Sequence, residues 1–334
     1  MAEPRGSSPM MSPRTLGQSN DLPQIIAHRG YKARFPENTL SAFKGAIAAG
    51  CHALEMDVHV SRDGVVVMSH DLSLERCYGV DRQIPDCDWD YLSTLRTVRE
   101  PHEPMPRLKD VLEYLAAPEL DEVWVLLDFK LTNDASRILP LLAETIKSVP
   151  PARRPWRERI MLGCWLPYYF PLCKEYLPGF RVVLNTPNTG LAQRVLRDPT
   201  TAHVHLNVLQ HALLYLGPKL ITTAHRQQDD PDRQVFIWTP NSPKAMRRAI
   251  RLGVDGVITD DPDSFRQLCE RWPEEDIPHR DEDRIGFREG IVLMLVTWLF
   301  RFLFWAIGPE LLQKLLLRRT VLLKARVKDA GKKK

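Results

Sequence analysis

The chain has 334 residues, 44% of them hydrophobic and 26% charged, a composition typical of a globular protein with a substantial core. The net charge of +4 is unevenly divided, because residues 284–334 hold 12 Lys/Arg against 3 Asp/Glu and residues 1–283 are left at −5. A basic tail on an acidic body argues against a nucleic-acid-binding domain and favours an anionic membrane surface as partner.

The N-terminal segment, residues 1–22, is rich in Ser, Pro and Gly and lacks hydrophobic periodicity, so we expect it to be disordered. It has no apolar core of the kind that a secretory signal requires. The six cysteines are dispersed without a Cys-x-x-Cys pair, which argues against a disulfide framework. We therefore expect the catalytic part of the chain to face the reducing cytosol.

From residue 24 to about 270, short apolar runs alternate with amphipathic stretches. Strands are predicted at Gln24–Ala27, Ala53–Val58, Val65–Ser69, Val123–Phe129, Ile160–Cys164, Arg181–Leu184, His203–Val208, Val235–Trp238 and Gly256–Thr259. Helices are predicted at Thr39–Ala49, Leu108–Ala116, Ser136–Lys147, Leu191–Arg197 and Pro243–Leu252. This alternation predicts βα units and a parallel sheet, with a doubly wound open sheet as the alternative to a barrel. Nine strands compete for the eight places of a barrel, so one of them must be peripheral.

Two histidines follow predicted strands. His28 precedes Arg29 and Gly30 directly after the first strand, and His70 follows the strand at 65–69. A turn with an ordinary helix cap at Asn38 or Thr39 is the alternative interpretation of the first of these patterns. Two histidines on successive βα loops, flanking a pair of carboxylates, favour an acid/base couple.

The carboxylates of that pair are Glu55 and Asp57. Residues two apart in a strand point to the same face, so both project together unless the strand is a solvated edge. Inside a barrel they would repel each other unless a cation lay between them, and oxygen ligands suit Mg²⁺ or Ca²⁺. The same spacing puts Asp128 and Lys130 on one face of their strand. This favours Asp128 as a third metal ligand and Lys130 as a phosphate contact, with a buried ion pair between them as the alternative. Trp238, at the end of a later strand, is a candidate substrate contact.

The C-terminal segment is unlike the rest of the chain. Residues 291–307 form its most apolar stretch, which is short for a membrane span and contains Arg301, and residues 310–334 continue as a basic amphipathic pattern. We expect residues 291–334, joined by a linker at 273–290, to lie in or dip into one leaflet of a membrane or lipid-droplet surface. The alternative is a terminal helix packed on the catalytic domain.

Three short motifs, taken in order, resemble the glycerophosphodiester phosphodiesterase family. They are HRG…PENT at 28–39, E-x-D-V at 55–58 and DG-x-VV…HD at 63–71. The likeness spans residues 25–265 and is closer to fungal phosphatidylglycerol phospholipases of the C type, through residues 28–39, 127–133, 258–262 and the hydrophobic tail. The resemblance implies a (β/α)₈ barrel over residues 23–272, an inserted loop or subdomain at 71–106, and one divalent cation.

Matching the motifs residue by residue implies a role for each site residue. The implied groups are an acid/base pair, His28 and His70; metal ligands, Glu55, Asp57 and Asp128; phosphate contacts, Arg29 and Lys130; and supporting residues, Glu37 and Asn38. Asp128 falls where many relatives have Glu. Which histidine is the acid and which the base is left open.

Three functions fit the sequence. The first is phospholipase C-type hydrolysis of phosphatidylglycerol to diacylglycerol and glycerol phosphate. The second is cleavage of soluble glycerophosphodiesters or lysophospholipids on the same residues, and the third is a catalytically silent, membrane-tethered binding protein. We expect the chain at the surface of the endoplasmic reticulum, lipid droplets or mitochondria. The sequence does not set its oligomeric state.

Overall fold

The computed structural model describes residues 22–201, 203–210, 221–224 and 233–272, together with part of 290–302. The predictions of a disordered segment at 1–22 and a linker at 273–290 lie almost entirely outside these residues. So does most of the tail predicted at 291–334.

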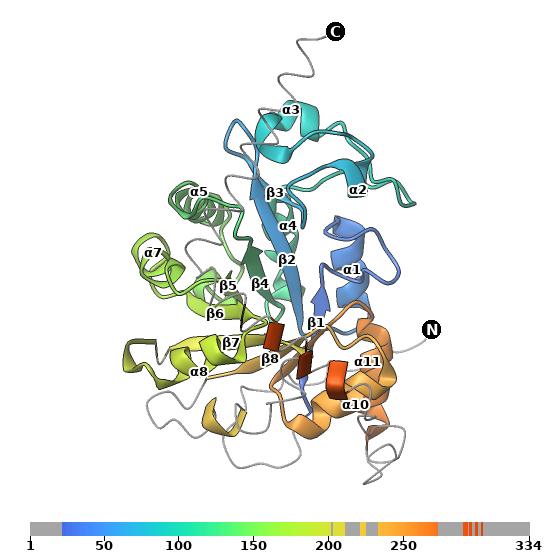
Figure 1. Ribbon diagram of the computed structural model, residues 1–334. Helices are drawn as coiled ribbons and strands as arrows, with labels where there is room; N and C mark the ends of the chain where they lie inside the picture. Colours follow the sequence, from blue (N-terminus) through green and yellow to red (C-terminus); the bar gives the residue numbers. More distant parts are fainter. Residues whose placement is uncertain are drawn as a thin grey trace.

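Eight parallel strands form a closed barrel (Figure 1). They are β1 (Gln24–His28), β2 (Ala53–Val60), β4 (Trp124–Phe129), β5 (Ile160–Cys164), β6 (Arg181–Thr186), β7 (Val204–Leu209), β8 (Val235–Trp238) and β9 (Gly256–Thr259). Because β1 pairs with both β2 and β9, the sheet closes on itself. The predicted barrel is confirmed, and the open doubly wound sheet is excluded.

Helices cover the outside of the barrel, with α5, α7 and α8 on one side and α1, α10 and α11 on another (Figure 1). Their bounds are α1 (Leu40–Ala48), α4 (Leu108–Leu115), α5 (Ala135–Ser148), α6 (Trp156–Arg159), α7 (Tyr169–Tyr176), α8 (Thr189–Arg197), α10 (Pro243–Leu252) and α11 (Pro262–Glu270). Side-chain caps set several of the starts, as where Thr39 Oγ1 accepts a hydrogen bond from the amide of Ala42 and begins α1.

The peripheral ninth strand is β3 (Val66–Met68), which pairs antiparallel with the end of β2. β2 and β3 therefore form a hairpin that extends beyond the barrel rim and returns to its mouth. His70 follows β3 on the returning arm of this hairpin, within the connection from β2 to α4 and β4, so the two histidines lie on successive βα connections of the barrel as predicted, although the strand that precedes His70 is antiparallel. A short apolar run has the same pattern in a parallel and in an antiparallel strand, so the sequence alone did not show that β3 is antiparallel.

The segment at 71–106 carries α2 (Glu75–Tyr78), the 3₁₀ turn η1 (Ile84–Asp86) and α3 (Trp89–Leu92), drawn above the barrel in Figure 1. It has a small core of its own, which includes Leu74, Ile84 and Leu92. This packing holds the segment beside the barrel mouth.

Inside the barrel, the inward side chains change from apolar to polar along several strands. An apolar layer fills the interior with Ile26, Ala53, Leu126, Met161, Val183, Phe236 and Ile258. The next inward positions toward the strand C-termini are polar on several strands, among them His28, Glu55 and Asp128. The apolar layer thus forms the floor beneath a polar pocket at the C-terminal mouth, where barrels of this kind place their active sites.

Candidate active site

Three buried carboxylates form the centre of the site. Glu55 and Asp57 project from β2 and Asp128 from β4, and ligand oxygens of the three lie within 4.8 Å of one another. The strand register pairs Asp57 with Asp128 at the same level of the barrel. The prediction that Glu55 and Asp57 share an inward face is confirmed, and a solvated edge strand is excluded by the complete burial of β2.

The three carboxylates repel one another, and two cationic side chains offset part of that repulsion. Burial, and then the charge of Asp57, raise the pKa of Glu55 well above its usual range. Asp57 stays ionised, because the charges of Lys130 and Arg29 outweigh its burial and lower its pKa. Lys130 lies with Nζ 2.6 Å from Asp57 Oδ1 and also contacts Asp128. The ammonium group thus occupies the space between two carboxylates, as the alternative of a buried ion pair anticipated.

The donor set fits a hard divalent cation. Asn38 donates a hydrogen bond of 2.9 Å to Asp57 Oδ2, whereas Asp57 Oδ1 accepts none of proper geometry despite its close ion pair with Lys130. Asp128 Oδ1 accepts hydrogen bonds from Trp165 Nε1 at 2.7 Å and Asn185 Nδ2 at 3.0 Å, which fix the orientation of that carboxylate. Oriented carboxylates with a lone pair still unused are the ligands that Mg²⁺ and Ca²⁺ prefer.

Arg29 lies between the triad and the first histidine. Its NH1 donates to Glu37 at 3.0 Å, and its Nε lies 3.4 Å from Asp57 Oδ2 and 3.3 Å from His28 Nε2. Arg29 adopts a left-handed backbone conformation with φ of 58°. Gly30 follows with φ of 81°, and a Cβ there would lie 2.7 Å from Ala42, so only glycine fits.

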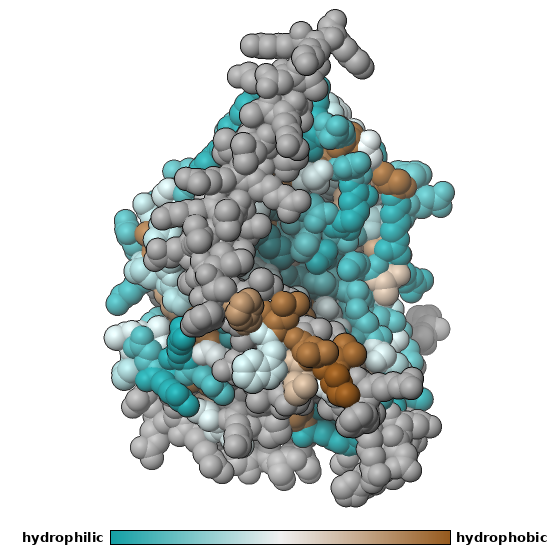
Figure 2. Space-filling view, viewed as in Figure 1, coloured by the Kyte–Doolittle hydropathy of each residue, from teal (hydrophilic) through white to brown (hydrophobic). Residues whose placement is uncertain are grey.

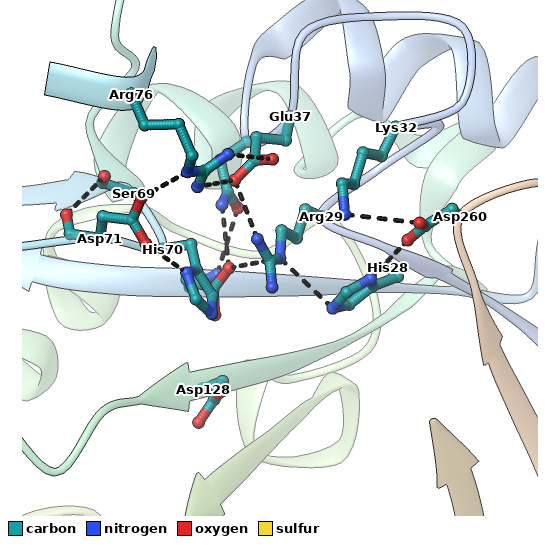
Figure 3. A network of polar contacts seen from close by, with 12 residues as sticks. His28, Arg29, Lys32, Glu37, Ser69, His70, Asp71, Arg76, Asp128 and Asp260 are labelled. Atoms are coloured by element: carbon teal, nitrogen blue, oxygen red, sulfur yellow. Dashed lines mark hydrogen bonds and ion pairs between the residues drawn. The ribbon is translucent and has the colours of Figure 1, made fainter. Parts of the chain in front are cut away.

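A second network holds His70. His70 Nδ1 lies 2.7 Å from Asp71 Oδ1, and Arg76 Nε donates to Asp71 Oδ2 at 2.5 Å (Figure 3). The other nitrogens of Arg76 donate to both oxygens of Glu37, at 2.7 and 2.9 Å. Burial would raise the pKa of Glu37, but hydrogen bonds from Arg76 and the charge of Arg29 lower it to about 2. Glu37 therefore joins the His70 and Arg29 networks as a permanent anion.

His28 also has an aspartate partner, since its Nδ1 lies 2.6 Å from Asp260 Oδ1 in the loop after β9 (Figure 3). Burial, together with the charge of Arg29, lowers the pKa of His28 despite this partner. Neutral His28 that donates from Nδ1 to Asp260 has a lone pair on Nε2, which accepts a long hydrogen bond of 3.3 Å from Arg29 Nε. This is the protonation state that a general base requires.

Replacing Asp260 with asparagine should lower kcat at least about tenfold, because the imidazole then loses the group that fixes its tautomer. The KM should change less than kcat. Asp263→Asn, on the outer helix α11, is the matched control and should behave as wild type. Steady-state kinetics on a soluble diester check this, and an unaltered kcat in Asp260→Asn would remove Asp260 from the site.

Most residues proposed from the sequence meet at this mouth: His28, Arg29, Glu37, Asn38, Glu55, Asp57, His70, Asp128 and Lys130. Trp238 lies beside them, with its ring 5.7 Å from that of Trp165 and its indole nitrogen buried without a hydrogen-bond partner among the described residues. That orphaned donor is consistent with a substrate contact, which stays a prediction.

Sequence reasoning gave no role in the site to Asp260, Arg76 or Asn185. One signal for Asp260 was available: two aspartates follow β9 in succession, and a helix needs only one as its cap. Asp261 caps α11 by accepting from the amide of Ser264, which leaves Asp260 for another role.

Comparison with known proteins agrees with this geometry. The model of the glycerophosphoryl diester phosphodiesterase family matches residues 28–264, more than two thirds of the chain. The chain belongs to this family. It is accordingly a phosphoric diester hydrolase, and a divalent metal at the buried acidic triad is the cofactor that the family and the site support.

Individual family members are distant relatives. The chain is 25% identical over 256 residues to a glycerophosphodiester phosphodiesterase of Caldanaerobacter subterraneus, covering 74% of this chain and 98% of that protein. It is also 25% identical over 290 residues to human lysophospholipase D GDPD1, covering 75% and 87% of the two chains. Among solved structures, a phosphodiesterase of Oleispira antarctica in complex with sn-glycerol-3-phosphate superposes with a TM-score of 0.63 at 21% identity, over 75% of this chain and 97% of that one.

Proposed function

We propose that this phosphodiesterase acts on a glycerophospholipid at a membrane surface, and that its substrate is phosphatidylglycerol, cleaved to diacylglycerol and glycerol phosphate. The observation that carries the membrane part is a row of exposed apolar side chains. Ile291, Val292, Leu295, Trp298, Leu299 and Phe302 are 38–62% exposed, and their spacing matches one face of a helix. The +9 charge of residues 284–334 would add attraction to an anionic lipid such as phosphatidylglycerol.

No helix among the described residues is long and apolar enough to cross a bilayer. We propose that the segment from residue 291 onward lies in the lipid interface, with the barrel on the cytosolic side. The endoplasmic reticulum, lipid droplets and mitochondria remain the proposed surfaces.

In the proposed mechanism, Arg29 neutralises and orients the substrate phosphate, and Lys130, beside the triad, supplies a second positive charge. A Mg²⁺ or Ca²⁺ ion held by Glu55, Asp57 and Asp128 would supply Lewis-acid stabilisation of the phosphoryl oxygens.

The two histidines carry the proton transfers. His28, neutral and with its Nε2 lone pair held only by a long hydrogen bond from Arg29, accepts the proton of the attacking hydroxyl, which belongs either to water or to the adjacent position of the headgroup glycerol. Attack by the neighbouring hydroxyl is intramolecular and therefore entropically favoured. It releases diacylglycerol and forms a 1,2-cyclic phosphate, which water must then open to give glycerol phosphate. His70, supported by Asp71, donates a proton to the departing alkoxide.

A second candidate is the cleavage of lysophospholipids or deacylated glycerophosphodiesters. The relatives of human and Caldanaerobacter origin favour it, since they are named as a lysophospholipase D and a glycerophosphodiester phosphodiesterase. The silent binding protein is set aside, because the chain belongs to a family of hydrolases and keeps a complete acidic triad.

Charged substitutions on the apolar row should separate membrane binding from catalysis. The triple variant Val292→Glu/Leu295→Glu/Leu299→Glu should hydrolyse phosphatidylglycerol vesicles at least about tenfold more slowly, because each glutamate opposes insertion into anionic lipid. Turnover of soluble glycerophosphoglycerol should be unchanged. The double variant Lys147→Glu/Ser148→Glu, at the exposed end of α5, controls for added negative charge. Equal loss on the vesicles and on the soluble diester would contradict the proposed role of the row.

A further inference from the structure

Two asparagines lie inside the barrel, shielded from water. Hydrophilic side chains cover much of the described surface (Figure 2), but Asn185 on β6 and Asn207 on β7 are only 2% and 4% exposed. The strand register pairs them directly, and both point inward, because Val183, two residues before Asn185, belongs to the apolar floor. A buried amide costs free energy unless its polar atoms find partners, so both side chains must be held by hydrogen bonds.

The two amides form a chain of hydrogen bonds that ends on a carboxylate of the triad. Asp128 Oδ1 accepts from Trp165 Nε1 at 2.7 Å and from Asn185 Nδ2 at 3.0 Å. Because that oxygen is an acceptor, Asn185 has to turn its NH₂ group toward it and its own Oδ1 away. Asn185 Oδ1 then accepts from Asn207 Nδ2 at 3.0 Å. Asn207 therefore fixes the orientation of Asn185, and Asn185 that of Asp128.

The strand between the two residues leaves room for this contact. β5 runs between β4 and β6, and its residue opposite Asp128 is Gly163. A Cβ at this position would lie 2.9 Å from Asn185 Nδ2, closer than such contacts allow. Asn185 thus reaches Asp128 across the intervening strand only because that position carries glycine.

The chain of amides ends on an unsatisfied atom. Asn207 Oδ1 is buried and has no hydrogen-bond partner among the described residues. A buried acceptor without a partner destabilises the folded state, and two apolar residues in place of both asparagines would leave no such atom at these positions. Packing of the barrel therefore does not account for the pair, whereas the hydrogen bond that it delivers to Asp128 does.

Holding Oδ1 of Asp128 determines where its other oxygen points. Oδ2 contacts the Lys130 ammonium group, which also lies 2.6 Å from Asp57 Oδ1. Asp128 Oδ2 and Asp57 Oδ1 thus face the same position, between two members of the triad. With fewer donors on Oδ1, the carboxylate is freer to rotate away from this direction.

We propose that Asn185 and Asn207 are positioning residues for the divalent cation, which keep Asp128 Oδ2 directed at the ion. Asn207 acts through Asn185, to which its NH₂ group donates. The inference rests on the proposed function in one respect, that the triad is the cation site. Residues that orient a metal ligand in this way typically raise metal affinity about 10- to 100-fold.

The test measures cation binding to the full-length protein by calorimetric titration of Mg²⁺ and Ca²⁺ in turn, without substrate. Asn185→Val should raise the Kd at least about tenfold, and Asn207→Val should raise it severalfold. Valine is apolar and suits a strand, so both variants should fold. The double variant should bind no more weakly than Asn185→Val alone, because Asn207 has no effect once Asn185 is absent. Its Tm without cation should equal or exceed that of wild type, since no amide is left unsatisfied.

Val208→Ala is the matched control, because Val208 follows Asn207 on β7 but belongs to the apolar cluster between the sheet and the helices. It should lower the Tm and leave the Kd unchanged, as a purely structural residue would. An unaltered Kd in either asparagine variant, or losses that add in the double variant, would overturn the proposal. A wild type that binds neither cation would overturn the cation site and this role together. A wild type that binds a cation but does not hydrolyse phosphatidylglycerol would overturn only the proposed substrate.

Discussion

Replacing either His28 or His70 with alanine is expected to lower kcat/KM by about 10²- to 10⁴-fold, the range that general acid–base catalysis contributes. Each histidine has an aspartate on Nδ1, at 2.6 Å for His28 and 2.7 Å for His70, so Nε2 is the nitrogen left to act on substrate. The double variant should lose little more than the worse single variant, because the two groups act in one proton-transfer sequence. His203→Ala, exposed at the opposite end of the barrel, should keep wild-type kinetics.

The leaving group should distinguish the two histidines. A p-nitrophenolate leaves without protonation, so a variant that lacks the general acid should recover much of its activity on bis(p-nitrophenyl) phosphate. We expect this recovery for His70→Ala and none for His28→Ala. Near-normal turnover of glycerophosphoglycerol by either single variant would contradict the assignment of the pair, and recovery in His28→Ala alone would reverse the roles.

The second large effect is expected for Glu55→Gln. Glutamine has the same shape and keeps an oxygen for the Arg29 amide, which donates to Glu55 Oε2 at 3.0 Å, so the variant should fold. It removes one of three charged ligands, and activity should fall by at least about 100-fold. This exceeds the loss expected from removing a residue that only hydrogen-bonds to a metal ligand.

A thermal readout separates cation binding from catalysis. At a cation concentration 100-fold above Kd, wild type should gain about 2.7 kcal/mol of stability, which corresponds to a rise in Tm of roughly 5–10 °C. Glu55→Gln should lose most of that rise while its Tm without cation stays near that of wild type. Glu175→Gln, on the outer helix α7, should respond to the cation as wild type does. A full cation-dependent rise in Glu55→Gln would place the ion elsewhere.

Much of the barrel and the centre of the site could be predicted from local patterns. The strands at Ile160–Cys164, Val235–Trp238 and Gly256–Thr259 match the predicted bounds. Period-2 spacing also sufficed to place Glu55 and Asp57 on one face, because that geometry is a property of a single strand.

The remainder depended on contacts between distant parts of the chain. His28 and Asp260 meet only because β1 pairs with β9 and closes the barrel, 232 residues apart in sequence. Arg76 joins Glu37 and Asp71 from a four-residue helix within a polar connection that gave no periodic signal. Gly163, whose register partner is Asp128, leaves the space through which Asn185 reaches that carboxylate. No pattern local to any of these segments specifies such partners.

The most direct test of the proposed function is identification of the products formed from phosphatidylglycerol vesicles by ³¹P NMR, with Mg²⁺ and Ca²⁺ supplied in turn. We predict a cation-dependent phosphate monoester, glycerol phosphate, with matching release of diacylglycerol. Formation of phosphatidate with free glycerol, or turnover of lysophospholipids and deacylated diesters without any of phosphatidylglycerol, would contradict it.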